Sequence, residues 1–475
     1  MTPQPVVCQS LQAMFMRNII LLSALVASSQ AITGLSTAAT PAEKFQKTSS
    51  VLSHFGTLTE PDSQPLVDSW REQQSVAGFK ALLPVFDPKK TFQRFSSLVQ
   101  NADGSWALNV FQDEDSKAVL DFSIPLAVDT LAAPEPFHTN ILNAAQNPPT
   151  QLLSGLRIAL DPGHMGGDEW DQKTGKIVSD GHGHKISEGL MNLQVSLLLK
   201  KEFETLGAEV LLTHNSLGPV TSISYQALDI PEFGSKRLGE LTLSDWFQKL
   251  ISGTLTGSTL FSAFEKNADF HALSSEAMRG YYFIKMADLD ARSEVITQFS
   301  PDISLIIHFD SLDASLEGES SGINPGGYDG VKTFINGGAL SDEFGSRDER
   351  VHFAQNLLDA RAWSASRSLS SAVANALKTE LKIPFDGSTG GGLSVPVEPG
   401  VFARNLRVSR KLHKTAMSSV ECLYYNAQKE FTALLEKKYS MEIDGVSYTY
   451  SERLAEVVRG IKTGVTGFVT NYKEP

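Results

Sequence analysis

Cysteine is almost absent from this chain, which has 475 residues and only two cysteines, Cys8 and Cys422. Cys8 lies ahead of an apolar N-terminal stretch that we expect to be removed, so the mature chain would hold one thiol and no internal disulfide. Stability must therefore come from a hydrophobic core, for which an apolar fraction of 41% is sufficient. A thiol nucleophile at Cys422 is an open alternative, disfavoured because no partner histidine stands near it in the sequence.

The chain also lacks any run rich in Lys and Arg, and its formal net charge is -13. A chain with this charge has no electrostatic footprint for a phosphate backbone, so we expect no nucleic-acid partner. After the N-terminal stretch, no segment has the roughly eighteen uninterrupted apolar residues that a transmembrane helix needs. We therefore predict no permanent membrane span.

The first 31 residues have the composition of a secretory signal peptide. Arg17 supplies a cation, Ile19 to Ala27 are apolar, and small residues follow as far as Ala31. The apolar part is too short to stay in a membrane as a helix. We predict a signal peptide at 1–31 and an exported protein, in the periplasm or alternatively outside the cell. An N-terminal core helix is the other interpretation, and no amphipathic pattern supports it.

Composition divides the remaining chain into segments. Residues 32–48 are rich in Ser, Thr, Ala and Pro, which indicates a flexible segment. Short apolar stretches separated by polar turns predict a small strand-rich domain of unknown role at 49–140. Prolines around 132–151 indicate a linker, which we place at 141–152. The main domain would occupy 153–475, with an insertion at about 214–280.

Strand and helix patterns alternate along this main domain. Strands are expected at 156–160, 209–213, 303–307 and 331–335, and helices at 189–206, 281–298 and 349–380. This alternation predicts an α/β fold with a mostly parallel, twisted sheet flanked by helices, of the phosphorylase/hydrolase-like type.

Three polar residues lie where such a fold binds ligands, beyond the carboxyl ends of its strands. His164 comes shortly after the strand 156–160, His308 directly follows the strand 303–307, and Glu188 precedes the helix 189–206. Two imidazoles and one carboxylate form a ligand set that catalytic zinc uses, with a fourth position left for water. Either histidine alone would more often be structural, and the spacings match no short zinc motif.

Several different motifs follow one another from about residue 153 to residue 470. They are Asp161-Pro-Gly-His164, Glu188 with Asn192-Leu193, Gly207 to Thr213, Arg292 ahead of Pro301 to His308, Gly400 to Leu406, and Ser419 to Asn426. Together they resemble the zinc-dependent N-acetylmuramoyl-L-alanine amidases, the type 3 family that includes periplasmic cell-wall amidases.

The resemblance implies one Zn²⁺ ion held by His164, Glu188 and His308, with Glu421 as the general base. The implied substrate is peptidoglycan, cut at the amide between N-acetylmuramic acid and the L-alanine of the stem peptide. Cell-wall remodelling or daughter-cell separation would be its role. Two alternatives stay open: a zinc peptidase acting on stem peptides, and a non-catalytic wall-binding or activator protein.

The closing motif departs from the family pattern. Leu423 and Tyr424 follow Cys422 where the family usually has a small residue and then an aromatic one, and Asn426 arrives one position early. This departure puts the geometry of the loop in doubt more than the base itself. Glu398 is a rival carboxylate, and we favour Glu421.

Several further features remain open from the sequence. Residues 240–264 contain an amphipathic piece, which is either a lid over the site, relieved by a protein activator, or a packed insertion. His182 and His184 could support or replace a ligand, although histidines in a Gly-flanked loop are more often exposed. Arg292 could orient a ligand carboxylate or hold its helix to the sheet. His352 is expected at the surface.

Overall fold

The computed structural model describes residues 76–226, 280, 283–340, 343–344 and 347–473, with gaps at 113–114, 116, 128–134, 175, 313–320, 325–326 and 390–392. The predicted signal peptide, the segment 32–48 and the amphipathic piece at 240–264 lie outside the described residues. The chain divides into two compact units. The first comprises Met1–Ser63, Ile223–Ala287 and Ser341–Glu349, and the second comprises Gln64–Ser222, Asp288–Leu340 and Arg350–Pro475. The candidate site lies wholly in the second unit.

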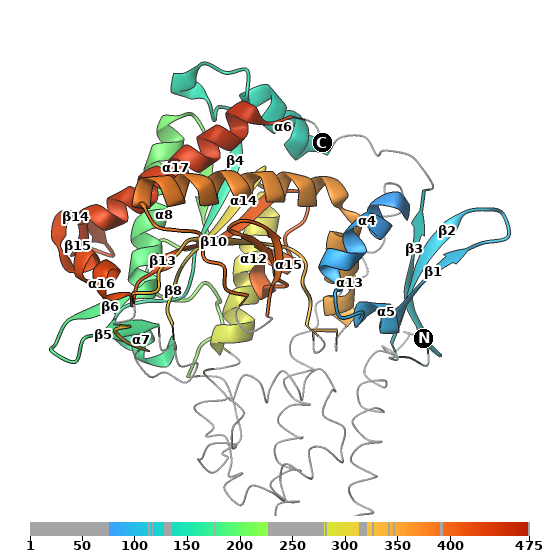
Figure 1. The fold of residues 1–475 in the computed structure, drawn as a ribbon, viewed down its shortest axis with the longest axis horizontal. Coiled ribbons are helices and arrows are strands. Elements are labelled where there is room, and N and C mark those ends of the chain that lie inside the picture. The colour runs from blue at the N-terminus through green and yellow to red at the C-terminus, as the bar shows by residue number, and fades with distance from the viewer. Residues whose placement is uncertain are drawn as a thin grey trace, which may run out of the picture. The chain divides into compact units, whose positions relative to one another are not determined.

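A seven-stranded sheet forms the centre of this second unit (Figure 1). Its order is β11-β12-β10-β13-β8-β4-β7. Strands β13, β8, β4 and β7 run parallel to one another, and β10 is parallel to β12, whereas β10 is antiparallel to β13 and β11 is antiparallel to β12. The bounds are β4 Arg157–Pro162, β7 Glu209–Leu212, β8 Ile303–Asp310, β10 Lys332–Ile335, β11 Val395–Glu398, β12 Val401–Ala403 and β13 Ala416–Tyr424. The predicted, mostly parallel α/β sheet is confirmed.

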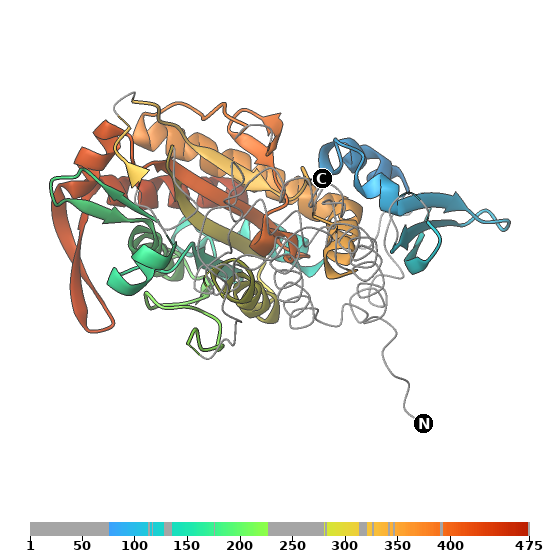
Figure 2. The ribbon, with the colours of Figure 1, turned by 90° about the horizontal axis from the view of Figure 1, so that it is seen from below.

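Helices cover both faces of this sheet, so its strands are apolar on both sides. Successive residues of one strand enter different clusters: Leu160 and Ile307 face helices α8, α14 and α17, while Ala159 and Ile306 face α12 and α15. Figure 2 shows β8 and β13 between α14 and α12. The bounds are α8 Glu188–Thr205, α12 Asp288–Phe299, α14 Ala360–Leu381, α15 Arg407–Arg410 and α17 Glu452–Asn471.

The predicted helical stretch 349–380 is two helices, α13 (Arg347–Leu358) and α14. Asp359 divides them because its side chain accepts a hydrogen bond from the backbone N–H of Ala362 at 2.9 Å and caps α14. The predicted helix 281–298 is a π-helical turn at Phe283–Ala287 followed by α12. Hydrophobic periodicity registers neither the cap at Asp359 nor the change from a π-helical turn to an α-helix.

The N-terminal part holds a small strand-rich sheet, as predicted. Strands β1 (Ser96–Gln100), β2 (Trp106–Phe111) and β3 (Leu120–Leu126) form an antiparallel meander after helices α4 (Val76–Phe86) and α5 (Phe92–Phe95). Helix α6 (Pro136–Ala144) and a 3-10 turn (Pro149–Gln151) follow. Within the predicted linker 141–152, Ile141 and Leu152 are buried in the main core, so these residues pack as part of the main fold.

Smaller elements lie around the main sheet. Helices α7 (Asp168–Thr174) and α16 (Gln428–Leu435), a sheet of β5 (Ile177–Ser179), β6 (Lys185–Ser187) and β9 (Ser321–Gly322), and a hairpin of β14 (Lys437–Ile443) and β15 (Val446–Ser451) complete the described elements. Within the described ranges, no helix has both the length and the apolar character to cross a membrane.

Candidate metal centre

Strand order brings the predicted site residues to one edge of the sheet. Strands β4, β8 and β13 are neighbours, and Glu421 of β13 lies in register with His308 of β8. On the other side of β8, Pro162 at the end of β4 pairs with Ile307, which places His164 just beyond the same edge. Glu188 reaches this edge from the first turn of α8, where Ser187 caps the helix.

The side chains of His164, Glu188 and His308 converge there. Their potential ligand atoms all lie within 4.8 Å of one another. Oε1 of Glu188 is 3.2 Å from Nε2 of His164 and 3.1 Å from Nδ1 of His308. The imidazole rings stand edge to face, with centroids 4.7 Å apart. Among the residues that the structure describes, no other group of three His, Cys, Asp or Glu side chains is arranged in this way.

Glycine allows this close approach at two positions. A Cβ atom at Gly163 would lie 2.3 Å from Cε1 of His308, and one at Gly189 would lie 2.2 Å from the carbonyl oxygen of Met165. Because neither glycine has a side chain, the backbone of the turn after β4 packs directly against both the His308 ring and the start of α8. His164 itself has a left-handed backbone with φ of 62°, which costs a non-glycine residue roughly 1–2 kcal/mol.

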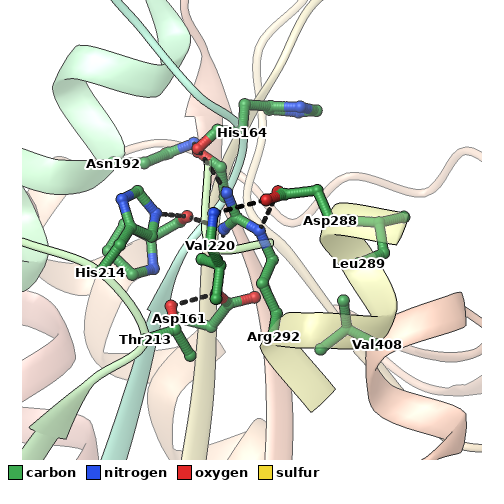
Figure 3. A network of polar contacts seen from close by, with 12 residues as sticks. Asp161, His164, Asn192, Thr213, His214, Val220, Asp288, Leu289, Arg292 and Val408 are labelled. Atoms are coloured by element: carbon green, nitrogen blue, oxygen red, sulfur yellow. Dashed lines mark hydrogen bonds and ion pairs between the residues drawn. The ribbon is translucent and has the colours of Figure 1, made fainter. Parts of the chain in front are cut away.

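Buried hydrogen bonds hold this strained turn in place (Figure 3). Asn192 donates to the carbonyl of Gly163 at 2.7 Å. Arg292 donates from Nη2 to the carbonyl of His164 at 2.9 Å and from Nη1 to the carbonyl of Pro162. Figure 3 shows the His164 ring directed away from this network, with its backbone carbonyl directed into it. The network therefore fixes the backbone from which the imidazole projects.

Arg292 is itself held by two buried carboxylates. Its Nε donates to Asp288 at 2.7 Å and its Nη1 donates to Asp161 at 3.0 Å, and all three side chains are 1% exposed. Of the two roles that the sequence left open for Arg292, the geometry supports a structural one: it ties α12 to the turn that carries His164. It does not contact the Glu188 carboxylate.

Glu188 is ionised in this setting. Burial opposes its charge, but the imidazoles and Lys176, whose Nζ is 3.8 Å from Oε2, outweigh burial and hold the pKa of Glu188 well below its usual range. Oε1 also accepts from the backbone N–H of Phe309 at 3.3 Å. Oε2 is buried and has no hydrogen-bond partner among the described residues. An ionised carboxylate whose buried Oε2 accepts no hydrogen bond is suited to a cation.

The two imidazoles differ in protonation. Burial lowers the pKa of His164 to about 3, so its ring is neutral. Burial acts in the same direction on His308, but its hydrogen bond to Glu188 and the charges of nearby carboxylates together outweigh burial and raise the pKa of His308. Because Glu188 accepts this hydrogen bond as an ionised carboxylate, Nδ1 of His308 carries the proton.

Two of the three donor spacings fit zinc. Ligand atoms about 2.0–2.2 Å from a tetrahedral zinc ion lie roughly 3.4 Å from each other. The two contacts of Glu188, at 3.1 and 3.2 Å, are close to that spacing. His164, Glu188 and His308 are therefore the residues that would hold a metal ion.

Glu421 lies beside this cluster on the next strand. Burial, followed by the nearby charge of Asp310, raises the pKa of Glu421 to about 8, and Oε2 is buried without a hydrogen-bond partner among the described residues. The rival Glu398 lies on β11, and strands β12, β10 and β13 separate it from β8. Its carboxylate pairs with Arg367 at 2.9 Å. Of these two carboxylates, Glu421 is the one that lies beside the cluster.

A buried polar network beyond Glu421 was not anticipated from the sequence. The ammonium of Lys332 on β10 contacts Asp310 at 2.5 Å, Asp386 at 2.8 Å and the hydroxyl of Tyr424 at 3.0 Å. Two signals were available: Lys332 is a charge at the start of a predicted strand, and Asp310 follows His308 by two residues on the same strand face. Neither signal says which partners meet.

The departures in the closing motif have structural counterparts. The pairing of β13 with β8 is irregular between Glu421 and Tyr424, which carries Tyr424 into the polar network. Asn426 is buried and bonds the backbone of Leu312 in both directions, at 3.1 and 2.7 Å. The irregularity therefore shifts the loop beyond Glu421 and leaves the in-register position of Glu421 unchanged.

The remaining candidates lie apart from the cluster. His184 contacts Asp180 at 2.5 Å and its side chain is 63% exposed, and His182 is also exposed. His352 contacts His413 through ring nitrogens 2.7 Å apart. Cys422 is fully buried, and burial raises the pKa of its thiol well above the usual value, which disfavours a thiolate nucleophile.

The fold and cluster together define an α/β protein with a two-histidine, one-carboxylate candidate metal centre. No protein-family model and no curated protein matches the chain. Solved structures that it matches include N-acetylmuramoyl-L-alanine amidases, at low similarity. Ami1 from Mycobacterium smegmatis is 14% identical with a TM-score of 0.33, covering 67% of this chain and 99% of its own.

Two further matches have similar values. CwlD of Clostridioides difficile, solved in complex with the GerS lipoprotein, is 15% identical with a TM-score of 0.32, over 66% of this chain and 98% of its own. AmiC2 of Nostoc punctiforme is 14% identical with a TM-score of 0.32, over the same shares. Similarity at this level assigns no activity, so the function below rests on the site and the sequence motifs.

Proposed function

We propose that this protein is a zinc-dependent peptidoglycan amidase that cleaves the amide between N-acetylmuramic acid and the L-alanine of the stem peptide. The observation that carries the proposal is the convergence of His164, Glu188 and His308 within 4.8 Å, with Glu421 in register beside His308. The ordered motifs that resemble this amidase family supply the substrate class.

The cluster suits amide hydrolysis chemically. When bound there, zinc would supply a water molecule of lowered pKa and would polarise the amide carbonyl. His164 is neutral and Glu188 is ionised, which are the protonation states that metal ligands need. Release of the proton held between His308 and Glu188 would accompany metal binding.

Glu421 would move the proton. Its Oε2 would accept a proton from the attacking water and return it to the departing alanine nitrogen. A pKa raised to about 8 keeps this carboxyl protonated at neutral pH, and positive charge held by the three ligands would lower that pKa and free it to act as a base.

Digestion of purified peptidoglycan tests the proposal. We expect the wild-type protein to bind one zinc ion and to release intact stem peptides with a free alanine amino terminus, detected by mass spectrometry. His308→Ala should lose both zinc and activity, whereas Glu421→Gln should keep zinc and lose turnover. Glu398→Gln, on the far edge of the sheet, is the matched control and should keep both.

The same measurements separate the alternatives. Shortened stem peptides would identify a zinc peptidase acting on the same polymer. Zinc binding with no cleavage by the wild type, even at high enzyme concentration, would indicate a non-catalytic wall-binding or activator protein. Full activity in Glu421→Gln would refute the assigned base.

The cellular setting is part of the proposal. An enzyme that cuts its own cell wall has to be exported, and the predicted signal peptide and periplasmic location agree with this requirement. We propose a role in cell-wall remodelling or daughter-cell separation. Restraint by a lid, relieved by a protein activator, stays a prediction because residues 240–264 lie outside the described residues.

A further inference from the structure

Lys332 and Glu421 are cross-strand neighbours that form no ion pair. Antiparallel strands β10 and β13 place Lys332 directly opposite Glu421, with both side chains on the same face of the sheet. Opposite charges at such positions ordinarily pair and stabilise the sheet. Here the ammonium of Lys332 bonds elsewhere, and Oε2 of Glu421 is without a hydrogen-bond partner among the described residues.

Three acceptors occupy the ammonium. Asp310 of β8 accepts at 2.5 Å, Asp386 accepts at 2.8 Å, and the hydroxyl of Tyr424 accepts at 3.0 Å. An ammonium has three N–H donors, so none is left for Glu421. Lys332 therefore crosses over strand β13 to reach β8, and passes the carboxyl that lies opposite it.

Asp386 is the fixed point of this arrangement. Its side chain is fully buried, and Oδ2 also accepts from the hydroxyl of Tyr424 at 2.6 Å. Oδ1 accepts from the hydroxyl of Tyr328 and from the backbone N–H of Ser388 at 2.7 Å. A carboxylate with this many donors is held rigidly, and it anchors the lysine that it binds.

We infer that Asp386 is a positioning residue for the reaction: with Asp310 it holds the Lys332 ammonium away from Glu421, so that the Glu421 carboxyl stays free to exchange a proton. This inference rests on the proposed role of Glu421 as the base. A lysine paired with Glu421 would occupy the lone pairs that the attacking water needs. The polar network thus acts on the chemistry through Lys332 rather than by touching the substrate.

Melting of the metal-free protein tests the geometric part without any activity. Lys332→Met, Glu421→Gln and the double variant are each made in two backgrounds, the wild type and Asp386→Asn. In each background, the shift in melting temperature of the double variant is compared with the sum of the two single shifts. We expect additive shifts in the wild-type background and non-additive ones in the Asp386→Asn background, where the freed lysine pairs with Glu421. Equal coupling in both backgrounds, including none in either, would overturn the inference.

Kinetics on a soluble muramoyl peptide test the functional part. Asp386→Asn should lower kcat by about tenfold or more while KM and zinc content stay unchanged, because the base is engaged by the lysine. Adding Lys332→Met to Asp386→Asn should restore part of the lost kcat. If the network only stabilises the fold, the double variant will be no more active than the single one, and that result would also overturn the inference.

A matched control separates general destabilisation from this effect. Asp121 is 2% exposed and pairs with Arg350 at 2.8 Å, so Asp121→Asn removes a comparable buried charge on the N-terminal strand β3. It should lower the melting temperature and leave kcat unchanged. Activity retained in Glu421→Gln would refute the proposed base instead, and the melting experiment would still decide whether Asp386 restrains Lys332.

Discussion

Replacement of Arg292 by methionine should destabilise both the fold and the metal centre. The guanidinium is buried and bonds two carboxylates and the carbonyls of Pro162 and His164. Removing one partner from a buried ion network costs about 3–5 kcal/mol, because it leaves charges uncompensated. Asp161 would keep its hydrogen bond from Thr213 at 2.6 Å, so we expect a loss near the lower end, about 3 kcal/mol.

Arg407 provides a matched comparison on a partly exposed pair. It forms a similar two-pronged contact with Asp290 of the same helix α12, at 2.9 and 2.7 Å, but the two side chains are 19% and 18% exposed. Asp290 would keep its contact with Lys411 at 3.0 Å, so Arg407→Met should cost no more than about 1 kcal/mol. Urea unfolding of the metal-free variants gives both free energies.

Zinc affinity is the second measurement. Because Arg292 fixes the carbonyl of His164, its loss should lower zinc affinity by roughly 10–100-fold, the usual effect of losing a group that orients a ligand. Arg407→Met should bind zinc as the wild type does. Equal losses of unfolding free energy in the two variants, or unchanged zinc affinity in Arg292→Met, would refute the assigned role.

Three further predictions concern close packing and pH. Gly163→Ala should abolish zinc binding, measured by metal content, because its Cβ would lie 2.3 Å from the His308 ring. On α17, Gly464→Ala should destabilise the fold because its Cβ would lie 2.5 Å from the backbone of α14, whereas Gly467→Ala, with nothing within 4 Å, should stabilise it by about 0.5–1 kcal/mol in urea unfolding. Burial raises the pKa of Glu135 to about 8. The contribution of Glu135 to stability is therefore complete below its unfolded pKa and is lost as the pH rises toward 8. Glu135→Gln should make the melting temperature less dependent on pH over that window, and an unchanged pH profile would refute this prediction.

Much of the fold was predictable because its signals are local. Buried strands of a parallel sheet are short continuous apolar runs, and the runs at 156–160 and 303–307 became β4 and β8. Helix α8 could be predicted from the periodicity of its apolar residues and from the glycine that follows it. The division of the stretch 349–380 at Asp359 was missed because a capping residue interrupts a helix without interrupting its hydrophobic pattern.

The residues of the candidate site also differ in whether a local sequence signal identifies them. His164 and His308 could be proposed from the sequence alone, because residues that follow buried parallel strands gather at one edge of the sheet. Glu188 needed the family resemblance, since a glutamate before a helix has no such geometric constraint. Lys332 could not be assigned a role from the sequence, because its role depends on partners that lie on distant segments of the chain.

The sequence by itself determined the elements, the apolar faces and the candidates for metal binding, because each depends on neighbours a few residues apart. Only the tertiary structure decided that β13 lies between β8 and β10, and so that Glu421 stands beside His308 on one side and opposite Lys332 on the other. Strand order depends on how segments separated by many residues pack over a common core, and no local pattern encodes that choice. The same packing sends Lys332 to Asp386 rather than to its cross-strand neighbour.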